Sequence, residues 1–107
     1  MPPHKDADFL EFVRDQLSSL PALSSRRMFG GIGLYQGPVF FAIIDDGVLY
    51  FVTDDETRAN YESRGMNPFE YAPGKVIKTY YQVPVDVLED DAELSQWARA
   101  AVGAQKR

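Results

Sequence analysis

The stretch VFFAIIDDGVLYFVT, residues 39–53, contains two apolar runs separated by the turn residues Asp45, Asp46 and Gly47. An Asp-Gly pair between runs of β-branched and aromatic residues is a strong signal for a β-hairpin. Neither run alternates with polar residues, so both strands are expected to be buried on both faces. The segment therefore predicts a hairpin within an antiparallel sheet.

The preceding stretch, RRMFGGIGLY, has three glycines in four residues and predicts the first strand of this sheet. With the two-residue period of a strand, Phe29, Gly31, Gly33 and Tyr35 lie on one side. Two aromatic residues then flank two positions without side chains. This arrangement predicts a shallow trough where a helix or a partner chain can approach the backbone closely.

Residues 27–53 as a whole predict a three-stranded antiparallel meander. A helix with one apolar stripe is predicted before it, over residues 7–20. After it, Thr53 and Glu56 have the spacing of a capping box and predict a second helix that ends at Gly65.

The rest of the chain predicts a further strand over residues 75–83, with Ile77, Tyr81 and Val83 on one face. Residues 67–74 predict a loop or a short edge strand. A last helix is predicted from the apolar spacing around Trp97.

The predicted fold class is α+β, with an antiparallel meander in the order α-β-β-β-α-β(β)-α. The length of 107 residues suits one domain with one core. We expect a single domain over residues 1–107, with residues 1–5 and 104–107 as loose ends.

Composition excludes several classes of protein. The absence of cysteine removes disulfides, thiolate zinc sites and cysteine nucleophiles together. The sequence contains neither an apolar run long enough for a membrane helix nor the apolar core of a signal peptide. We therefore expect a cytoplasmic protein that does not bind membranes.

The net charge of −5 disfavours nucleic acid as a partner, because the long-range field repels phosphate. The basic residues are scattered and form no continuous stripe. Direct nucleic-acid binding nevertheless stays open as an alternative, carried by Arg26, Arg27, Lys75 and Lys78.

No catalytic, cofactor or metal site is expected. The glycines lack the third position of a dinucleotide fingerprint, where Gln36 stands, and no P-loop lysine follows them. His4 is the only histidine and lies in the predicted tail, so no Ser–His–Asp set can be built. The acidic pairs at Asp45, Asp54 and Glu89 are interpreted as turn and cap residues.

A combination of motifs covers nearly the whole chain. They are M-F-G-G-x-G-L-Y at residues 28–35, L-Y-F at 49–51, Y-E-x-x-G-x-x-P-F-x-Y at 61–71, Y-Y-x-V-P at 80–84 and L-E-D at 88–90, with Trp97. This combination resembles the N-terminal domain of the TfoX (Sxy) competence regulators of bacteria.

The resemblance implies a small α+β sheet domain with a role in competence and transcription regulation. Full-length regulators of this family join the domain to a helical C-terminal domain and promote transcription of DNA-uptake genes together with a cyclic-AMP receptor protein. The family supplies no established catalytic residues. The chain ends at Arg107, so we expect it to be a stand-alone version of the domain.

We therefore expect a non-enzymatic regulatory or protein-interaction domain. Its partner is expected to be a second copy, as a homodimer, or a transcription regulator. The candidate interaction surface comprises Arg26, Arg27, Phe29, Gly31, Gly33, Tyr35, Lys78 and Tyr80. A third interpretation is a small-ligand binder or enzyme whose pocket is lined by Tyr50, Tyr80 and Tyr81.

Overall fold

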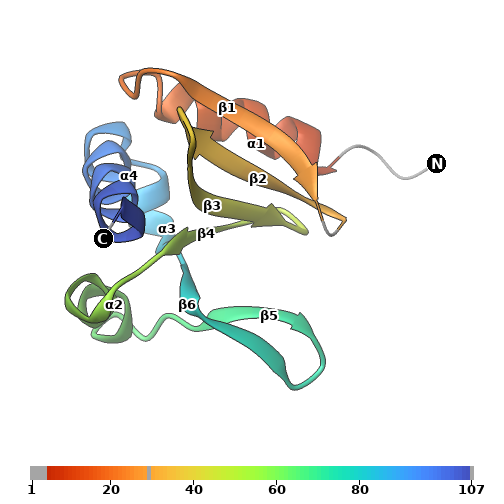
Figure 1. Cartoon of the computed structure of the whole chain (residues 1–107), viewed down its shortest axis with the longest axis vertical. Coiled ribbons are helices and arrows are strands. Elements are labelled where there is room, and N and C mark those ends of the chain that lie inside the picture. The colour runs from red at the N-terminus through yellow and green to blue at the C-terminus, as the bar shows by residue number, and fades with distance from the viewer. Residues whose placement is uncertain (1–4, 29, 107) are drawn as a thin grey trace.

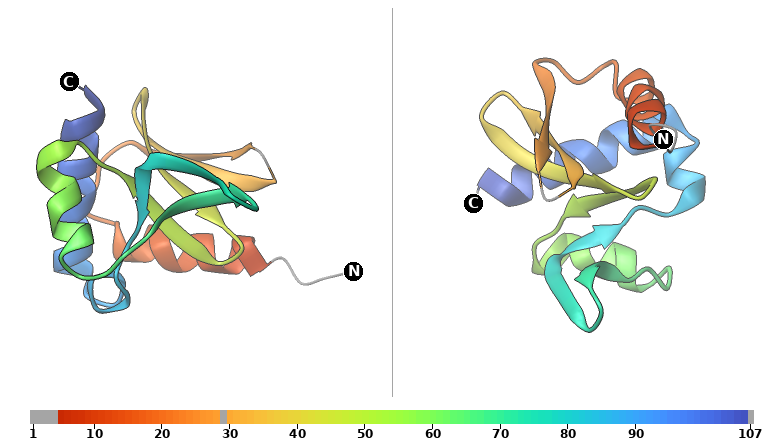
Figure 2. Two further views of the ribbon diagram at one scale, coloured as in Figure 1. Left: turned by 90° about the horizontal axis from the view of Figure 1, so that it is seen from below. Right: turned by 90° about the vertical axis from the view of Figure 1, so that its right-hand side faces the viewer.

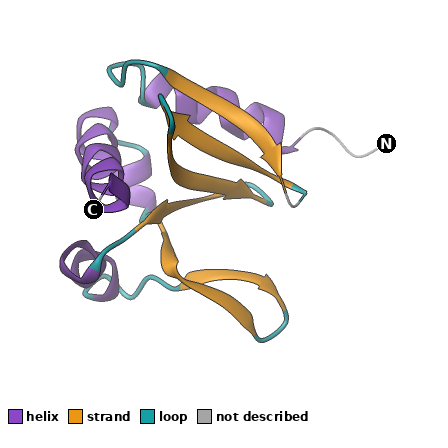
Figure 3. Cartoon of the chain, viewed as in Figure 1, coloured by secondary structure: helices purple, strands orange, loops and turns teal. Residues whose placement is uncertain are grey.

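The computed structural model describes residues 5–28 and 30–106 and shows a single α+β domain (Figure 1). Its elements are α1 (Lys5–Gln16), β1 (Leu23–Met28), β2 (Gly31–Gln36), β3 (Val39–Asp45), β4 (Val48–Val52), α2 (Asp55–Glu62), β5 (Pro68–Ala72), β6 (Lys75–Gln82), α3 (Val85–Leu88) and α4 (Asp91–Lys106). The described strands form one antiparallel sheet in the order β1-β2-β3-β4-β6-β5. Figure 3 shows the four helices around this sheet.

The hairpin predicted from the Asp-Gly pair is confirmed. Asp45 pairs with Val48, and the two turn residues between them both have positive φ, 52° at Asp46 and 73° at Gly47. A two-residue turn of this kind matches the right-handed twist of the flanking strands, and glycine adopts its second position without strain.

The meander differs from the prediction, because it has four strands where three were expected. A turn that includes Gly30, at φ 79°, divides the expected first strand into β1 and β2. β1 begins at Leu23, in a segment that the sequence predicts to be a link. The sequence of β1, LSSRRM, lacks the alternation of apolar and polar residues that would indicate a strand. β1 is an edge strand and needs few buried residues.

The sheet is curved, and its two ends bend away from α1 toward the same side (Figures 1 and 2). α1 lies behind the convex face, and α4 packs across the central strands β3 and β4. Alternation places Ile32, Leu34, Ile44, Leu49 and Phe51 on the convex face, where all of them are buried. This face and the helices form the main core.

A β-bulge in β3 adds to that core. Leu34 pairs with Ala42 and Tyr35 pairs with Phe40, so Phe41 is an extra residue on β3. Phe41 is fully buried and its ring lies 5.8 Å from the ring of Phe51. The bulge therefore lets β3 place two successive side chains into the same core.

The first and last helices also differ from the prediction, whereas residues 1–4 and 107, which were expected to be loose as well, lie outside the described residues. α4 continues to Lys106, whereas residues 104–107 were expected to be loose. The side chain of Gln105 donates a hydrogen bond to the Phe40 carbonyl at 2.9 Å and ties this last turn to β3. α1 begins at Lys5 and ends at Gln16, four residues earlier than predicted.

The segment left open between loop and edge strand is β5. Its pairing with β6 is irregular, since Pro68 pairs with Tyr81 but Phe69 pairs with Ile77. The extra residues of β6 place Tyr81 opposite Phe51 on the convex face, while Ile77 lies beside Phe69 and Tyr71 around a hollow. The prediction that Ile77 and Tyr81 share one face was therefore wrong.

Across residues 5–28 and 30–106, none of the helices has the length and apolar character that crossing a bilayer requires.

The N-cap of α2 is one residue later than the sequence predicts. The Asp54 carboxylate accepts a hydrogen bond from the Thr57 backbone N–H at 2.8 Å, and the Thr57 hydroxyl accepts one from the Asp54 N–H at 3.0 Å. Thr53, the predicted cap, is buried and donates its hydroxyl proton to the Thr79 carbonyl at 2.8 Å. The Thr53 hydroxyl also accepts a hydrogen bond from Arg58 Nε of α2 at 3.1 Å, so Thr53 joins α2 to β6 instead of capping the helix.

The two caps can be distinguished by substitution. Asp54→Ala removes the acceptor of the reciprocal pair and is expected to lower the free energy of unfolding by about 1 kcal/mol. Glu56→Gln, the matched control, is expected to change it by less than about 0.5 kcal/mol. Urea denaturation measures both, and a larger loss in Glu56→Gln would contradict the Asp54 cap.

Candidate interaction surface

A row of side chains in contact with one another crosses the concave face of the sheet. Arg26 of β1 lies over the ring of Tyr35, 5.8 Å from its centroid. The ring of Tyr35 lies 5.2 Å from Phe40, and Phe40 lies 5.7 Å from Tyr80 of β6. The row joins β1, β2, β3 and β6 and becomes more buried from Arg26, which is exposed, to Tyr80, which is 6% exposed.

The predicted trough at the glycines is filled by the domain's own side chains. A Cβ at Gly33 would lie 2.6 Å from Met28 Cε and 2.9 Å from Phe40 Cε1. A Cβ at Gly31 would lie 2.6 Å from the Ile44 carbonyl oxygen. Met28 and Phe40 therefore occupy the space that was expected to receive a partner, and both glycines are buried.

The remaining predicted residues are not all on this face. Arg27 pairs with Ile32 and points to the side opposite Arg26, which pairs with Gly33. Lys78 is exposed on β6, the fifth strand in the sheet order, whereas Arg26 is on the first. Phe29 lies outside the described residues. Only Arg26, Tyr35 and Tyr80 of the predicted set belong to the row.

The hydroxyl of Tyr80 is unusual because it is buried and makes no hydrogen bond of good geometry to any described residue. Burial, followed by the nearby Tyr35, raises the Tyr80 pKa to about 12. The Gln105 side chain lowers that pKa in turn, and one N–H of its amide donates to the Phe40 carbonyl at 2.9 Å. Among the described residues the Tyr80 hydroxyl therefore has no partner at hydrogen-bond geometry.

The tyrosines of the third interpretation do not line one pocket. Tyr50 and Tyr80 pair with Gln82 and Val52 on the concave side, whereas Tyr81, adjacent to Tyr80, points to the convex side. There the Tyr81 ring lies 6.0 Å from Tyr61, and its hydroxyl donates to Glu62 at 3.3 Å. Alternation along β6 separates these side chains.

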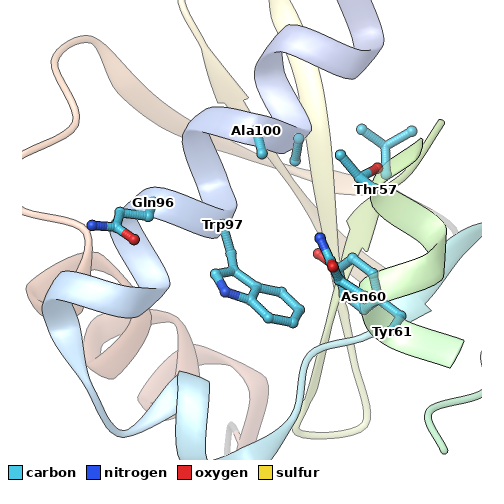
Figure 4. A pocket seen from close by; sticks show the side chains of 8 residues that line it. Thr57, Asn60, Tyr61, Gln96, Trp97 and Ala100 are labelled. Atoms are coloured by element: carbon cyan, nitrogen blue, oxygen red, sulfur yellow. The ribbon is translucent and has the colours of Figure 1, made fainter. Parts of the chain in front are cut away.

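A second cluster lies between α2 and α4 (Figure 4). The Trp97 ring meets Tyr61 edge to face at 4.8 Å, and the Arg64 guanidinium lies 5.1 Å from the Trp97 ring centroid. Arg64 also forms an ion pair with Asp86 of α3 at 3.0 Å. The hollow beside this cluster measures about 80 Å³, so the cluster chiefly packs three helices together.

Sequence reasoning missed Phe40 and Arg64 as members of these clusters. Phe40 lies in a continuous apolar run, where no alternation signals which face it occupies. Arg64 precedes the glycine that follows α2, and nothing in the sequence indicates that its guanidinium lies over the distant Trp97 ring. Among the described residues, no group of three or more acidic side chains has the arrangement of a metal site.

The comparison with known families concerns most of the chain. Residues 15–105 match the model of the TfoX N-terminal domain. The chain belongs to the TfoX N-terminal domain family. The resemblance inferred from the motifs is thereby confirmed.

One relative of this TfoX N-terminal domain is the DNA transformation protein TfoX1 of Aliivibrio fischeri (strain ATCC 700601 / ES114). It is 32% identical over 82 residues, which is 75% of this chain and 37% of that protein. The chain thus spans little more than a third of the length of this curated relative.

The structure shows the packing role of several residues in the family motifs. Gly31 and Gly33 admit the Ile44 carbonyl and the Met28 and Phe40 side chains, and Tyr61 supports Trp97. Phe69 of the motif at residues 61–71 is buried and lies 4.6 Å from the Tyr50 ring. These motif residues in the TfoX N-terminal domain specify the curved sheet and its packing.

Alanine substitutions test whether the glycines are structural. Gly33→Ala is expected to cost about 1–2 kcal/mol, because the ends of Met28 and Phe40 must move. Gly31→Ala is expected to cost about 3 kcal/mol, because its Cβ meets a backbone carbonyl that cannot turn away. Urea denaturation measures the free energy of unfolding of each variant.

The matched control is Gly103→Ala on α4, where an added Cβ meets nothing within 4 Å. It is expected to raise stability by about 0.5–1 kcal/mol through helix propensity. Unchanged stability in both strand variants would show that the trough is open after all.

Tyr80→Phe tests the unpaired hydroxyl. Removing a buried hydroxyl without a partner is expected to stabilise the domain by about 1 kcal/mol at pH 7. The raised pKa means that wild-type stability is complete below pH 10 and falls as the pH rises from about 10 to 12, because the unfolded tyrosine ionises first. Tyr80→Phe is expected to reduce this alkaline loss.

The comparison variant is Tyr81→Phe, which loses the hydrogen bond to Glu62 and is expected to be destabilised by up to about 1 kcal/mol. Thermal denaturation at pH 7 and at pH 10–12 measures both variants. A clear loss of stability in Tyr80→Phe at pH 7 would mean that its hydroxyl has a hydrogen-bond partner.

Proposed function

We propose that this domain is a non-enzymatic regulatory module that binds a protein partner through the concave face of its sheet. The row from Arg26 to Tyr80 supports this function most directly. It places an exposed guanidinium on an aromatic surface, and arginine and tyrosine are the residue types enriched where binding energy concentrates at protein interfaces.

Family membership gives this binding a context. The relative from Aliivibrio fischeri is named a DNA transformation protein, so we propose that the domain takes part in regulating DNA uptake. The chain corresponds to about a third of that protein, and a module of this size suits recognition of a transcription regulator. A second copy of the domain is the other protein partner that the same face would fit.

The neighbouring residues Arg26 and Arg27 provide a matched pair for the test. Both are exposed, both carry one charge, and they point to opposite sides of β1. Arg26→Ala is expected to weaken partner binding about fivefold to thirtyfold, the range for 1–2 kcal/mol at an interface residue. Arg27→Ala is expected to leave binding within about twofold.

The measurement is affinity capture from a native cell extract treated with nuclease, followed by titration of the recovered protein against each variant. Equal losses for the two arginine variants would contradict the concave face as the interface. Capture that disappears after nuclease treatment would assign the binding to nucleic acid. Light scattering of the domain alone at high concentration identifies self-association.

A further inference from the structure

The concave face contains a second feature, a hollow of about 360 Å³ near the β3–β4 turn. Its lining residues come from three strands: Asp45 at the end of β3, Phe69 and Tyr71 on β5, and Ile77 on β6. Three of the four are apolar or aromatic, and the fourth is a carboxylate.

Two aromatic side chains, Phe69 and Tyr71, form one wall of the hollow, and Phe69 packs against Tyr50 of β4. Phe69 is 5% exposed and lies 4.6 Å from the Tyr50 ring, so its ring is packed against the sheet. The ring of Tyr71 follows at 6.5 Å and is 56% exposed, although it is a large aromatic side chain. A buried inner ring and an exposed outer ring together form an aromatic surface that is open to a ligand.

The negative charge of the Asp45 carboxylate is disfavoured by its surroundings. Partial burial, followed by the charges of Asp6 and Asp46, raises its pKa. Asp45 has no ion pair with any residue that the structure describes. The Asp6 carboxylate accepts a hydrogen bond from the Gly47 N–H at 2.7 Å, which holds it beside the turn. A cation in the hollow would relieve this repulsion.

We propose that the hollow formed by Asp45, Phe69, Tyr71 and Ile77 binds an arginine side chain from a basic segment of the protein partner. A guanidinium offers two apolar faces that stack on aromatic rings and an edge of N–H donors that suits a carboxylate. The four lining residues supply both kinds of contact. This assignment rests on the proposed function, because it specifies what one part of the concave face recognises.

A phosphate-bearing ligand does not fit this site. Asp6, Asp45 and Asp46 gather at this end of the sheet, and their combined charge repels phosphate. Lys75 and Lys78 lie on β6 but do not line the hollow. The chemistry of the site therefore favours a basic peptide over a nucleic acid.

The test uses two peptides that differ in one side chain, Ac-Leu-Arg-Leu-NH2 and Ac-Leu-Gln-Leu-NH2, titrated into the isotope-labelled domain and followed by backbone amide NMR shifts. The arginine peptide is expected to shift the amides around Asp45, Tyr71 and Ile77. It is expected to bind about tenfold more tightly than the glutamine peptide.

Three variants locate the effect. Asp45→Asn is expected to abolish the difference between the peptides, and Tyr71→Ala to weaken the arginine peptide about tenfold, without loss of fold because Tyr71 is exposed. Glu89→Gln, an exposed carboxylate elsewhere, is expected to change neither. Equal binding of the two peptides, shifts confined to another face, or an unaltered preference in Asp45→Asn would each overturn the proposal.

The outcome is separable from that of the proposed function. If Asp45→Asn keeps full affinity for the captured partner while Arg26→Ala loses it, the concave face is an interface and the arginine site is refuted. If the peptides discriminate as expected but no partner is captured, the site is supported and the proposed function is not.

Discussion

The fold depends on one constraint: the two central strands are apolar on both faces, and the helices cover only part of the concave face, where Val52 lies against α2 and α4. α1 lies behind the convex face, and α4 packs across β3 and β4. The rest of the concave face is buried by curvature, which brings Met28 and Phe40 over Gly33 and Phe69 over Tyr50. Without side chains at Gly31 and Gly33, the central strands can be covered by the sheet itself.

The predictions from sequence succeeded where the signal was local. The Asp-Gly turn determines the central hairpin through the φ values of two residues, and the neighbouring strands follow from apolar runs. The predictions failed where a contact joins residues distant in sequence. The trough at Gly33 was recognised as a missing side chain, but nothing in the sequence shows that Met28 and Phe40 fill it.

The difference between local signals and contacts between distant residues also explains which members of the candidate surface were predicted. A two-residue period correctly places Tyr35 with Gly33, but it cannot show that β1 is a separate strand that turns back and brings Arg26 onto the Tyr35 ring. It also fails along β6, where extra residues opposite β5 change the face that Ile77 occupies. The face that a side chain occupies can be predicted from the sequence within a regular strand. It cannot be predicted across a bulge, because the extra residues shift the alternation.

The polar composition of β1, which concealed this strand from pattern analysis, has a consequence for the behaviour of the folded chain at high concentration. An edge strand presents unpaired backbone N–H and C=O groups that can recruit strands from other molecules and begin aggregation. β1 carries two serines and two arginines at this edge, and β5, at the other edge, begins with a proline and pairs irregularly. Both edges thus carry features that oppose the addition of a strand from another molecule and so lower the tendency of the folded domain to aggregate.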